Sequence, residues 1–445
     1  MDVAPPWEEA AKRRRGKAQY VMPPKALLDE CASLMEQVFK FDHPADAVVA
    51  RFFRENRSLG PRERATLSDT VYAALRERLK FEWFARSGSG SKWRKLSILG
   101  FPGDRDFLKS ALTDQEKNWL DNCLNASDNE LMAPHRHNMP EWLASALREQ
   151  VGDEFDALVA SLNQMAALDL RVNLLKKKRD AVLADLRQAG LACDPTPYSP
   201  IGIRLQGKPS LAKLPSFVQG DVEVQDEGSQ LLALLMDAKR GEMVVDFCAG
   251  AGGKTLAMGA AMRNSGRLYA FDTSAHRLDA LKPRLARSGL SNVHPVAIAH
   301  ERDDRIKRLA GKIDRVLVDA PCSGLGTLRR SPDLKWRQTP ESVAELAQLQ
   351  TAILHSAARL LKPGGRLVYA TCSPLAQEDE AVVQAFGQAH PEFEPLEVKG
   401  LLEGAQVSHS ESLVASDVGQ SVLRLWPHRH GTDGFFAAVW QKRPV

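Results

Sequence analysis

Five short apolar segments alternate with helical sequence from residue 240 onward, and this alternation constrains the fold of the chain most. The segments are MVVDF (243–247), RLYAFD (267–272), VHPVAIA (293–299), RVLVDA (315–320) and RLVYAT (366–371). Each has the short, apolar, β-rich character of a buried strand, and helical sequence separates it from the next. Strands spaced in this way form a parallel sheet with helices on both faces. We therefore predict an α/β domain in this part of the chain.

The last two apolar segments are arranged differently. SVLRLWP and GFFAAVWQ are joined by the short segment HRHGTD. Strands joined by such a short connection pair as an antiparallel hairpin. The predicted sheet is therefore mixed, mainly parallel, and ends in an antiparallel hairpin.

The first third of the chain is predicted to be all-α. Leu27, Leu28, Cys31, Leu34 and Val38 recur at helical spacing, and RATLSDTVYAALRERLKFEWFA is a long periodic segment without Gly or Pro. From about residue 167 to residue 222, short strand-like segments alternate with helical sequence. With about 150 residues per domain, we expect two or three domains. The predicted divisions are a basic arm (1–20), a helical domain (21–166), a small α+β connector (167–222) and a catalytic domain (223–445).

Charge and cysteine content exclude several classes of protein. The 60 Lys and Arg residues nearly balance 56 Asp and Glu, giving a net charge of +4, so a histone-like binder is excluded while local basic patches remain possible. No apolar run approaches the roughly 18 residues of a membrane span, and the N-terminus lacks the apolar core of a secretory signal. Six cysteines are too few for a disulfide scaffold. We expect a cytoplasmic protein with reduced thiols and no membrane contact.

A glycine-rich loop follows the first predicted strand of the α/β domain. Small residues there let a ligand approach the backbone, and Asp272 at the end of the next strand can bind ribose hydroxyls. The loop is not a P-loop, because Cys248 stands where the first glycine of that motif is required. A nucleoside cofactor is the favoured interpretation, and a simple packing loop is the alternative. The loop residues are Cys248, Ala249, Gly250, Ala251, Gly252, Gly253 and Lys254.

Two cysteines follow two further strands, in Asp319-Ala320-Pro321-Cys322-Ser323-Gly324 and in Thr371-Cys372-Ser373-Pro374. Parallel strands joined by one crossover helix are often neighbours, so both thiols are expected in one crevice. A single cysteine is more often structural, and no ligand set for a metal accompanies this pair. A disulfide switch would be unusual in the cytosol. Nucleophilic catalysis fits better, because a thiolate adding to C6 of a pyrimidine activates C5 for methylation and a second thiol can assist release.

Three basic segments are candidates for nucleic-acid contact. Cations bind phosphates, and an aromatic side chain such as Trp336 can stack on a base. A solvated surface is the equally good interpretation of each segment taken singly. The segments are Lys92–Lys95, Lys176–Arg179, and the loop with Arg329, Arg330, Lys335, Trp336 and Arg337.

These motifs together resemble those of the RsmB/Sun-type RNA (cytosine-5) methyltransferases, which use S-adenosyl-L-methionine (SAM). The resemblance implies a class I, Rossmann-like methyltransferase domain, and the helical first third is similar to a NusB-like RNA-binding module in LGPRERATLSDTVYAALR. The shared motifs are Leu170-Arg171-Val172-Asn173, Gln225–Gln230, the 246–255 loop, the two cysteine motifs, and Gly434-Phe435-Phe436.

The resemblance also implies roles for individual residues. Cys372 would be the nucleophile, Cys322 would help to release the product, and Asp319 would orient cytosine or cofactor with Lys254 close by. Cys248 to Lys254, Asp272 and Asp319 would hold SAM. The family loop reads Ala-Pro-Gly-Gly-Lys, whereas this chain has Gly250-Ala251 in place of Ala-Pro. The acid that contacts adenine is left open among Glu301, Asp303 and Asp304.

The expected function is methylation of C5 of a cytosine in RNA, with ribosomal RNA as the favoured substrate. Transfer RNA is the alternative substrate with the same chemistry. A third hypothesis is a non-catalytic RNA-binding factor in ribosome assembly that keeps a degenerate methyltransferase fold. We expect a monomer that needs SAM and no metal.

Overall fold

The computed structural model describes residues 22–126, 131–207, 209–417 and 420–444. The predicted basic arm lies outside the described residues. By internal contacts the chain divides into two compact units, Met1–Pro140 and Glu141–Val445. Each unit is described by itself below.

The described part of the first unit is all-helical, as predicted. The predicted apolar stripe on α2 is buried, with Leu27, Leu28 and Leu34 almost fully shielded from solvent. Helix α6 packs against both α2 and α4. At Gly100 of α6, an added Cβ would stand 2.7 Å from the carbonyl oxygen of Thr70, so the close approach of α6 to α4 requires glycine. The helices are α2 (Pro24–Val38), α3 (Ala45–Glu55), α4 (Pro61–Arg76), α5 (Arg78–Phe84), α6 (Lys92–Gly100), α7 (Arg105–Ser110), α8 (Asp114–Asn125) and α9 (Ala133–His137).

The long helix predicted over 64–85 is interrupted. Helix α4 ends at Arg76 and α5 begins at Arg78, with Glu77 between them at φ −107°. The side chain of Asn138 accepts a hydrogen bond from the backbone N–H of Lys80 at 3.1 Å. This partner lies 58 residues further along the chain, so local periodicity contains no sign of the interruption.

The second unit begins with α10 (Glu141–Val151) and α11 (Phe155–Leu162). Internal contacts group these helices with the second unit, whereas the sequence pattern placed them with the first. Glu154, between the two helices, pairs with Arg429 of α22 (Pro427–His430), and α11 packs against α22. The helical pair is therefore tied to the part of the chain near the C-terminus.

A small antiparallel sheet follows in the order β2-β3-β1-β4. Leu170 and Val172 of β1 pack with Val182 and Leu186 of α12 (Arg179–Gln188) in one apolar cluster. The strand–helix–strand pattern seen in the sequence corresponds to β1, α12 and β3. The strands are β1 (Leu168–Val172), β2 (Cys193–Pro195), β3 (Gly202–Leu205) and β4 (Val222–Val224), and α13 (Pro215–Val218) precedes β4.

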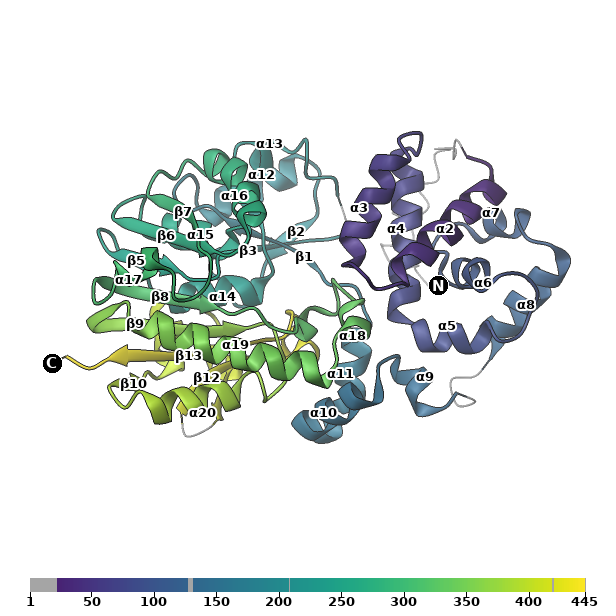
Figure 1. The fold of residues 1–445 in the computed structure, drawn as a ribbon. Helices are drawn as coiled ribbons and strands as arrows, with labels where there is room; N and C mark the ends of the chain where they lie inside the picture. Colours follow the sequence, from purple (N-terminus) through teal and green to yellow (C-terminus); the bar gives the residue numbers. More distant parts are fainter. Residues whose placement is uncertain (1–21, 127–130, 208, 418–419, 445) are drawn as a thin grey trace, which may run out of the picture. The chain divides into compact units, whose positions relative to one another are not determined.

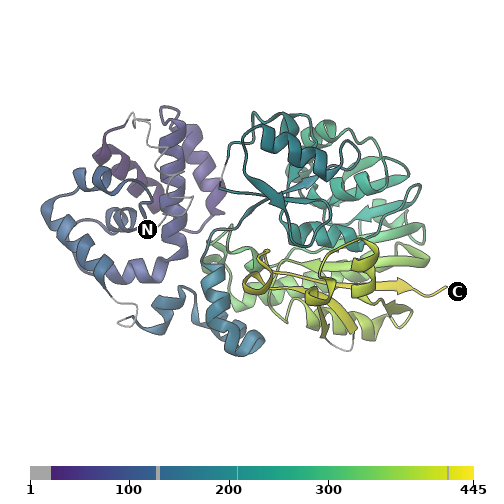
Figure 2. The same cartoon turned by 180° about the vertical axis from the view of Figure 1, so that it is seen from behind.

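The large sheet confirms the predicted mixed topology (Figures 1 and 2). Its strands run in the order β11-β12-β13-β9-β8-β5-β6-β7, and β10 pairs with β13. Strands β5 to β9 pair in parallel, whereas β13 pairs antiparallel with both β9 and β12. The strands are β5 (Met243–Asp246), β6 (Arg267–Asp272), β7 (Val293–Ala297), β8 (Ile313–Asp319), β9 (Leu361–Thr371), β10 (Phe393–Pro395), β11 (Val414–Asp417), β12 (Gln420–Leu425) and β13 (Phe435–Lys442).

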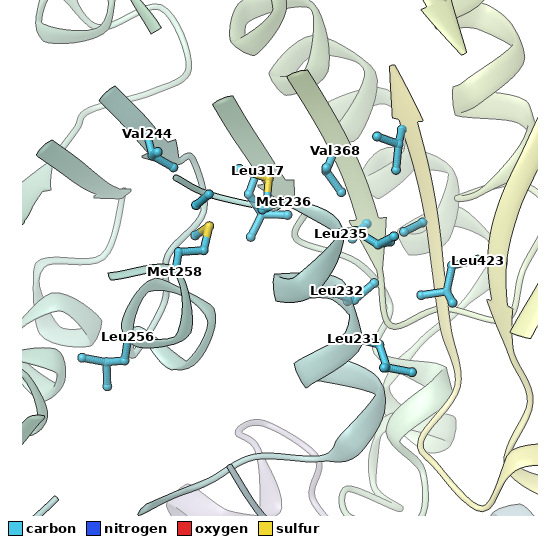
Figure 3. Close-up of a cluster of buried hydrophobic side chains, with 14 of the residues drawn as sticks. Leu231, Leu232, Leu235, Met236, Val244, Leu256, Met258, Leu317, Val368 and Leu423 are labelled. Atoms are coloured by element: carbon cyan, nitrogen blue, oxygen red, sulfur yellow. The ribbon is translucent and has the colours of Figure 1, made fainter. Parts of the chain in front are cut away.

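Helices cover both faces of this sheet because successive strand residues point to opposite sides. Val244 and Leu317 face one apolar cluster, while their neighbours Val245 and Val318 face the other. Figure 3 shows the leucines of α14 beside the first of these faces. No described helix is long and apolar enough to cross a membrane. The first face carries α14 (Glu227–Leu235), α15 (Gly253–Ala261), α16 (Ala275–Ser288) and α21 (Val398–Gly404), and the second carries α17 (Asp304–Lys307), α19 (Pro340–Ala358) and α20 (Glu380–Ala389).

The strand order creates a switch point between β5 and β8. The chain proceeds outward from β5 through β6 to β7, then returns to build β8 and β9 on the other side of β5. In open α/β sheets, ligands bind outside the carboxyl ends of the strands at such a point. Because β5, β6, β8 and β9 are parallel, the loops that follow them meet at this one edge.

Candidate active site

A cavity of about 890 Å³ opens at the carboxyl edge of the parallel strands. The loops that follow β5, β6, β7, β8 and β9 all contribute to its wall. The structure thus brings nearly all the predicted site residues to one place. Those that line the cavity are Cys248, Ala249, Gly250, Ala251, Gly253, Lys254, Asp272, Asp319, Cys322 and Cys372.

Gly252 does not line the cavity and instead shapes the glycine-rich loop. It caps the N-terminus of α15 at φ 82°, in the left-handed region that favours glycine. A Cβ at this position would stand 2.2 Å from Cδ1 of Leu281. Gly250 also has a positive φ of 56°, and no atom lies within 4 Å of the place a Cβ would occupy. The two glycines therefore allow a tight turn whose backbone is open to a ligand.

Asp272 connects this loop to the end of β6. Its Oδ2 accepts a hydrogen bond from the backbone N–H of Gly250 at 2.8 Å, and its Oδ1 accepts one from Ser274 N–H at 2.7 Å. A carboxylate has about four acceptor sites, so two remain for other donors. Asp272 lines the cavity, and its carboxylate can accept further hydrogen bonds there, for example from the hydroxyls of a ribose.

The structure separates the three acids that follow β7. Asp303 caps α17 by accepting from the N–H groups of Ala299 and Arg305, each at 2.9 Å. Asp304 pairs with Lys307 at the surface. Of the three, only Glu301 lines the cavity.

Apolar side chains also form part of the cavity wall. Phe247, Ile298 and Ile353 all line it. The lining therefore combines apolar surface for a purine base with the carboxylates of Glu301 and Asp272, which can accept from an amine and from ribose hydroxyls. The residues present therefore fit a nucleoside cofactor such as SAM.

Lys254 and Asp319 form an ion pair inside the cavity wall, with Nζ 2.7 Å from Oδ2. Burial alone would lower the pKa of Lys254. The negative charge of Asp319 and its hydrogen bond outweigh burial, and the pKa of Lys254 is raised above its usual value. Lys254 therefore carries a positive charge within the site at neutral pH.

Cys322 and Cys372 lie side by side, as their positions after adjacent strands predicted. Strands β8 and β9 pair in parallel, with Asp319 opposite Ala370. The two Sγ atoms are 3.4 Å apart, and the backbone N–H of Cys372 points to Sγ of Cys322 at the same distance. The thiols are thus within hydrogen-bonding distance of each other on the cavity wall.

Two thiols of the cavity wall have raised pKa values. The hydrogen bond to Cys372, together with burial, raises the pKa of Cys322 well above its ordinary value. The thiol of Cys248 also has a raised pKa because it is buried and faces acidic side chains. Both groups therefore keep their protons at neutral pH.

Several cations of the predicted basic loop after Cys322 are bound to other parts of the second unit. Arg329 donates to the carbonyl oxygens of Gly431 and Thr432, and Arg330 pairs with Asp433 and Asp226. Lys335, only 1% exposed, donates to Asn163 at 2.9 Å. The prediction that Arg329 and Lys335 reach phosphates is wrong, because both side chains are buried and hold the fold together. Arg330 is paired as well, but 33% of its side chain stays exposed. Arg337 pairs with Asp333.

The other two basic segments are partly used in the same way. Lys95 donates to the backbone oxygen of Ser87 at 3.1 Å and is buried. Arg94 pairs with Glu116. In the connector, Lys176 donates to the backbone oxygens of Gln219 and Arg287. A run of cations in the sequence therefore overstates the charge available to RNA.

One buried carboxylate near the two cysteines was not predicted from the sequence. Glu378 follows Cys372 by six positions, in the acidic run Glu378-Asp379-Glu380, and is fully buried. An acidic run is usually solvated, so the pattern gave no sign of burial. Glu378 accepts hydrogen bonds from the serines that follow each cysteine.

This fold and site define a class of protein. A mixed sheet with this strand order, a glycine-rich loop after its first parallel strand and a carboxylate after its second is the architecture of the class I methyltransferases. The family model described as 16S rRNA methyltransferase RsmB/F matches residues 233–441, and that of the RsmF/B-like ferredoxin-like domain matches 139–212. The chain belongs to the RsmB/F family of RNA methyltransferases, and its methyl donor is SAM.

Curated relatives and a solved structure agree with this membership. A probable ribosomal RNA small subunit methyltransferase B from Synechocystis sp. is 35% identical over 333 residues, covering 74% of this chain and 71% of the relative. The protein of the same description from Bacillus subtilis is 32% identical over 348 residues, covering 78% and 76%. The crystal structure of a methyltransferase homolog protein from Pyrococcus horikoshii has a TM-score of 0.59 and 28% identity, covering 71% of this chain and all of that one.

Proposed function

We propose that this protein methylates C5 of a cytosine in ribosomal RNA through a covalent bond between Cys372 and the base. The observation that carries the proposal is the 3.4 Å separation of the Cys322 and Cys372 sulfur atoms on the wall of the cavity that also holds the glycine-rich loop. The descriptions of the relatives as small-subunit ribosomal RNA methyltransferases support ribosomal RNA as the substrate.

A thiol is needed because C5 of cytosine is too electron-poor to take a methyl group unaided. The Cys372 thiolate adds to C6, forming an S–C6 bond and moving an electron pair onto C5. Bound SAM supplies a methyl group on a sulfonium, which C5 then accepts. Loss of the C5 proton afterwards returns the electron pair to the ring, and the S–C6 bond breaks to restore the Cys372 thiolate.

Cys322 is assigned to the release step. Its sulfur atom lies 3.4 Å from that of Cys372, so it is close to the base once Cys372 is bonded to C6. In its thiolate form, Cys322 takes the proton from C5, and the S–C6 bond breaks as the electron pair returns to the ring.

Lys254 and Asp319 support the nucleophile and the base. The positive charge of Lys254 lowers the cost of a thiolate at Cys372. Asp319 holds the ammonium group by its 2.7 Å ion pair and has a free oxygen for the cytosine or the cofactor. In this proposal, both residues touch the reacting groups.

The glycine-rich loop, Asp272 and Glu301 are assigned to the cofactor. The loop backbone from Cys248 to Lys254 contacts the amino-acid part, Asp272 accepts from the ribose hydroxyls, and Glu301 accepts from the adenine. Glu301 takes this role because it faces the cavity while Asp303 and Asp304 are used elsewhere. The helical first unit is assigned to RNA binding, and the protein to the cytoplasm as a monomer.

Bisulfite sequencing of total RNA, with and without the gene, tests the substrate. The expected result is the loss of one 5-methylcytosine in small-subunit ribosomal RNA. Loss of a signal in transfer RNA instead would transfer the activity to that substrate. An unchanged map of all RNA would contradict cytosine-5 methylation.

A further inference from the structure

Glu378 lies between the two cysteine-bearing loops, in the turn that joins β9 to α20. Its side chain is fully buried. The Oε1 atom accepts a hydrogen bond from the backbone N–H of Ser323 at 2.8 Å, and Oε2 accepts one from the hydroxyl of the same serine at 2.5 Å. Oε2 also accepts a hydrogen bond from the hydroxyl of Ser373. Ser323 directly follows Cys322, and Ser373 directly follows Cys372, so one carboxylate holds both loops.

Gln350 of α19 extends the same network to the other side of Cys322. Its Nε2 donates to Oε1 of Glu378 and to the backbone oxygen of Pro321, both at 3.0 Å. The hydroxyl of Tyr369 donates to the backbone oxygen of Glu378 at 2.6 Å. Gln350 thus holds the residue before Cys322, Glu378 holds the residue after it, and the two side chains are hydrogen-bonded to each other.

The donor set explains why a carboxylate is present at this buried position. Two hydroxyls, a side-chain amide and a backbone N–H donate to Glu378, and a buried carboxylate is tolerated only when its acceptor sites are filled in this way. Hydrogen bonds to a charged acceptor are roughly twice as strong as neutral ones. Displacing either cysteine loop breaks at least one of them.

We infer that Glu378 is a positioning residue that sets the distance between Cys322 and Cys372 by holding the residue after each cysteine. The inference rests on the proposed function for its consequence in catalysis, because release needs the second thiol close to the first. The role of Glu378 in setting the distance between the two sulfur atoms does not depend on the proposed function. A reacting group displaced by about 1 Å can cost roughly a hundredfold in rate, so such an anchor matters for turnover.

Disulfide trapping measures the thiol separation without any RNA. Oxidised glutathione joins Cys322 to Cys372 in the full-length protein as two thiol protons are lost and one glutathione disulfide is reduced to two thiols. The rate, followed by mass spectrometry, reports how often the two sulfur atoms meet. In Glu378→Gln, an amide NH₂ replaces one acceptor oxygen, so a serine donor loses its partner. We expect trapping to slow by about tenfold or more.

Glu380→Gln is the matched control. Glu380 lies two positions further on, at the start of α20, and pairs with Arg424 of β12 instead of a cysteine loop. We expect this variant to trap at the wild-type rate. Equal rates for Glu378→Gln and the wild type, or equal slowing in both variants, would overturn the inference.

Ser373→Ala keeps the test decisive if Glu378→Gln does not fold. It removes one donor to Glu378 and leaves the carboxylate with three. The expected result is slower trapping with unchanged affinity for SAM, because the glycine-rich loop is untouched. In a folded Glu378→Gln protein, adding Ser373→Ala should cause little further slowing, since both changes break the same contact.

Catalytic measurements separate this inference from the proposed function. Glu378→Gln should lower kcat for methylation, leave KM for SAM unchanged, and increase the fraction of RNA held in a covalent adduct. If trapping slows but the wild-type protein methylates no cytosine, the proposed function fails and the positioning role stands. If cytosine is methylated and trapping is unaffected, the positioning role fails alone.

Discussion

The sulfur atom of Cys322 lies 3.4 Å from that of Cys372, although 50 residues and the whole of α19 separate the two cysteines in the chain. The crossover from β8 through α19 to β9 produces this proximity, because it returns the chain to the adjacent parallel strand. Both thiols then belong to loops at the same edge of the sheet, beside the glycine-rich loop.

Cys372→Ala should abolish methyl transfer, with a rate loss of at least about a thousandfold, because the variant lacks the thiol that is assigned to bond to C6. The affinity for SAM should be unchanged, since Cys372 is not assigned to the cofactor. Transfer of a labelled methyl group to RNA and calorimetric titration with SAM measure the two quantities. A full rate in this variant would eliminate the covalent mechanism.

Cys322→Ala should accumulate a covalent RNA–protein adduct. The nucleophile is intact in this variant, but the group assigned to the C5 proton is missing, so the reaction stops after methylation. The adduct is visible as a slower band on a denaturing gel, and Cys193→Ala, which changes a buried thiol in the small antiparallel sheet, is a control that should give none. Free, methylated RNA without a slower band would move the release role to another residue.

Gly252→Ala should destabilise the protein by about 1–3 kcal/mol, because alanine at φ 82° is strained and its Cβ would meet Leu281. Gly253→Ala is the matched control, one position further on. The nearest atom to its Cβ is 3.6 Å away, and alanine is a better helix former than glycine. Thermal unfolding without SAM compares the two, and equal midpoints would contradict the strain argument.

Asp246→Asn should stabilise the protein at pH 8 and have little effect below pH 4. Burial raises the pKa of Asp246 from 3.8 to about 7, partly opposed by a hydrogen bond from Thr255. The folded state therefore holds this proton more tightly than the unfolded state, and stability is lost as pH rises from about 4 to 7. Asparagine keeps an acceptor for Thr255 and has no charge to bury. Denaturant unfolding across this pH range should show the two proteins converging at low pH, and a constant difference would be inconsistent with this cause.

Arg330→Ala should lower the free energy of unfolding by about 1–3 kcal/mol, because it leaves two largely buried carboxylates, Asp226 and Asp433, without their shared cation, which is itself partly solvent-screened. The dependence of RNA affinity on salt should change little, since this guanidinium is held by two carboxylates. Binding isotherms at several salt concentrations supply the measurement. A reduced salt slope would return Arg330 to the RNA-binding surface.

Much of the fold could be predicted because its signals are local. The alternation of apolar segments with helical sequence, the short connection before Phe435, and the small residues from Gly250 to Gly253 each act over a few positions. The rule that parallel strands share a carboxyl edge then brought Asp272, Cys322 and Cys372 together without coordinates.

The sequence by itself thus determined the class of fold, the edge of the sheet where the site lies and the two thiols on its wall. Only the tertiary structure decided how the charged side chains are used. It placed Glu301 on the cavity and Asp303 on a helix cap, buried Lys335, and set Glu378 between the cysteine loops. The physical reason is that a charge is buried or solvated according to partners from distant parts of the chain, and local patterns contain no record of those partners.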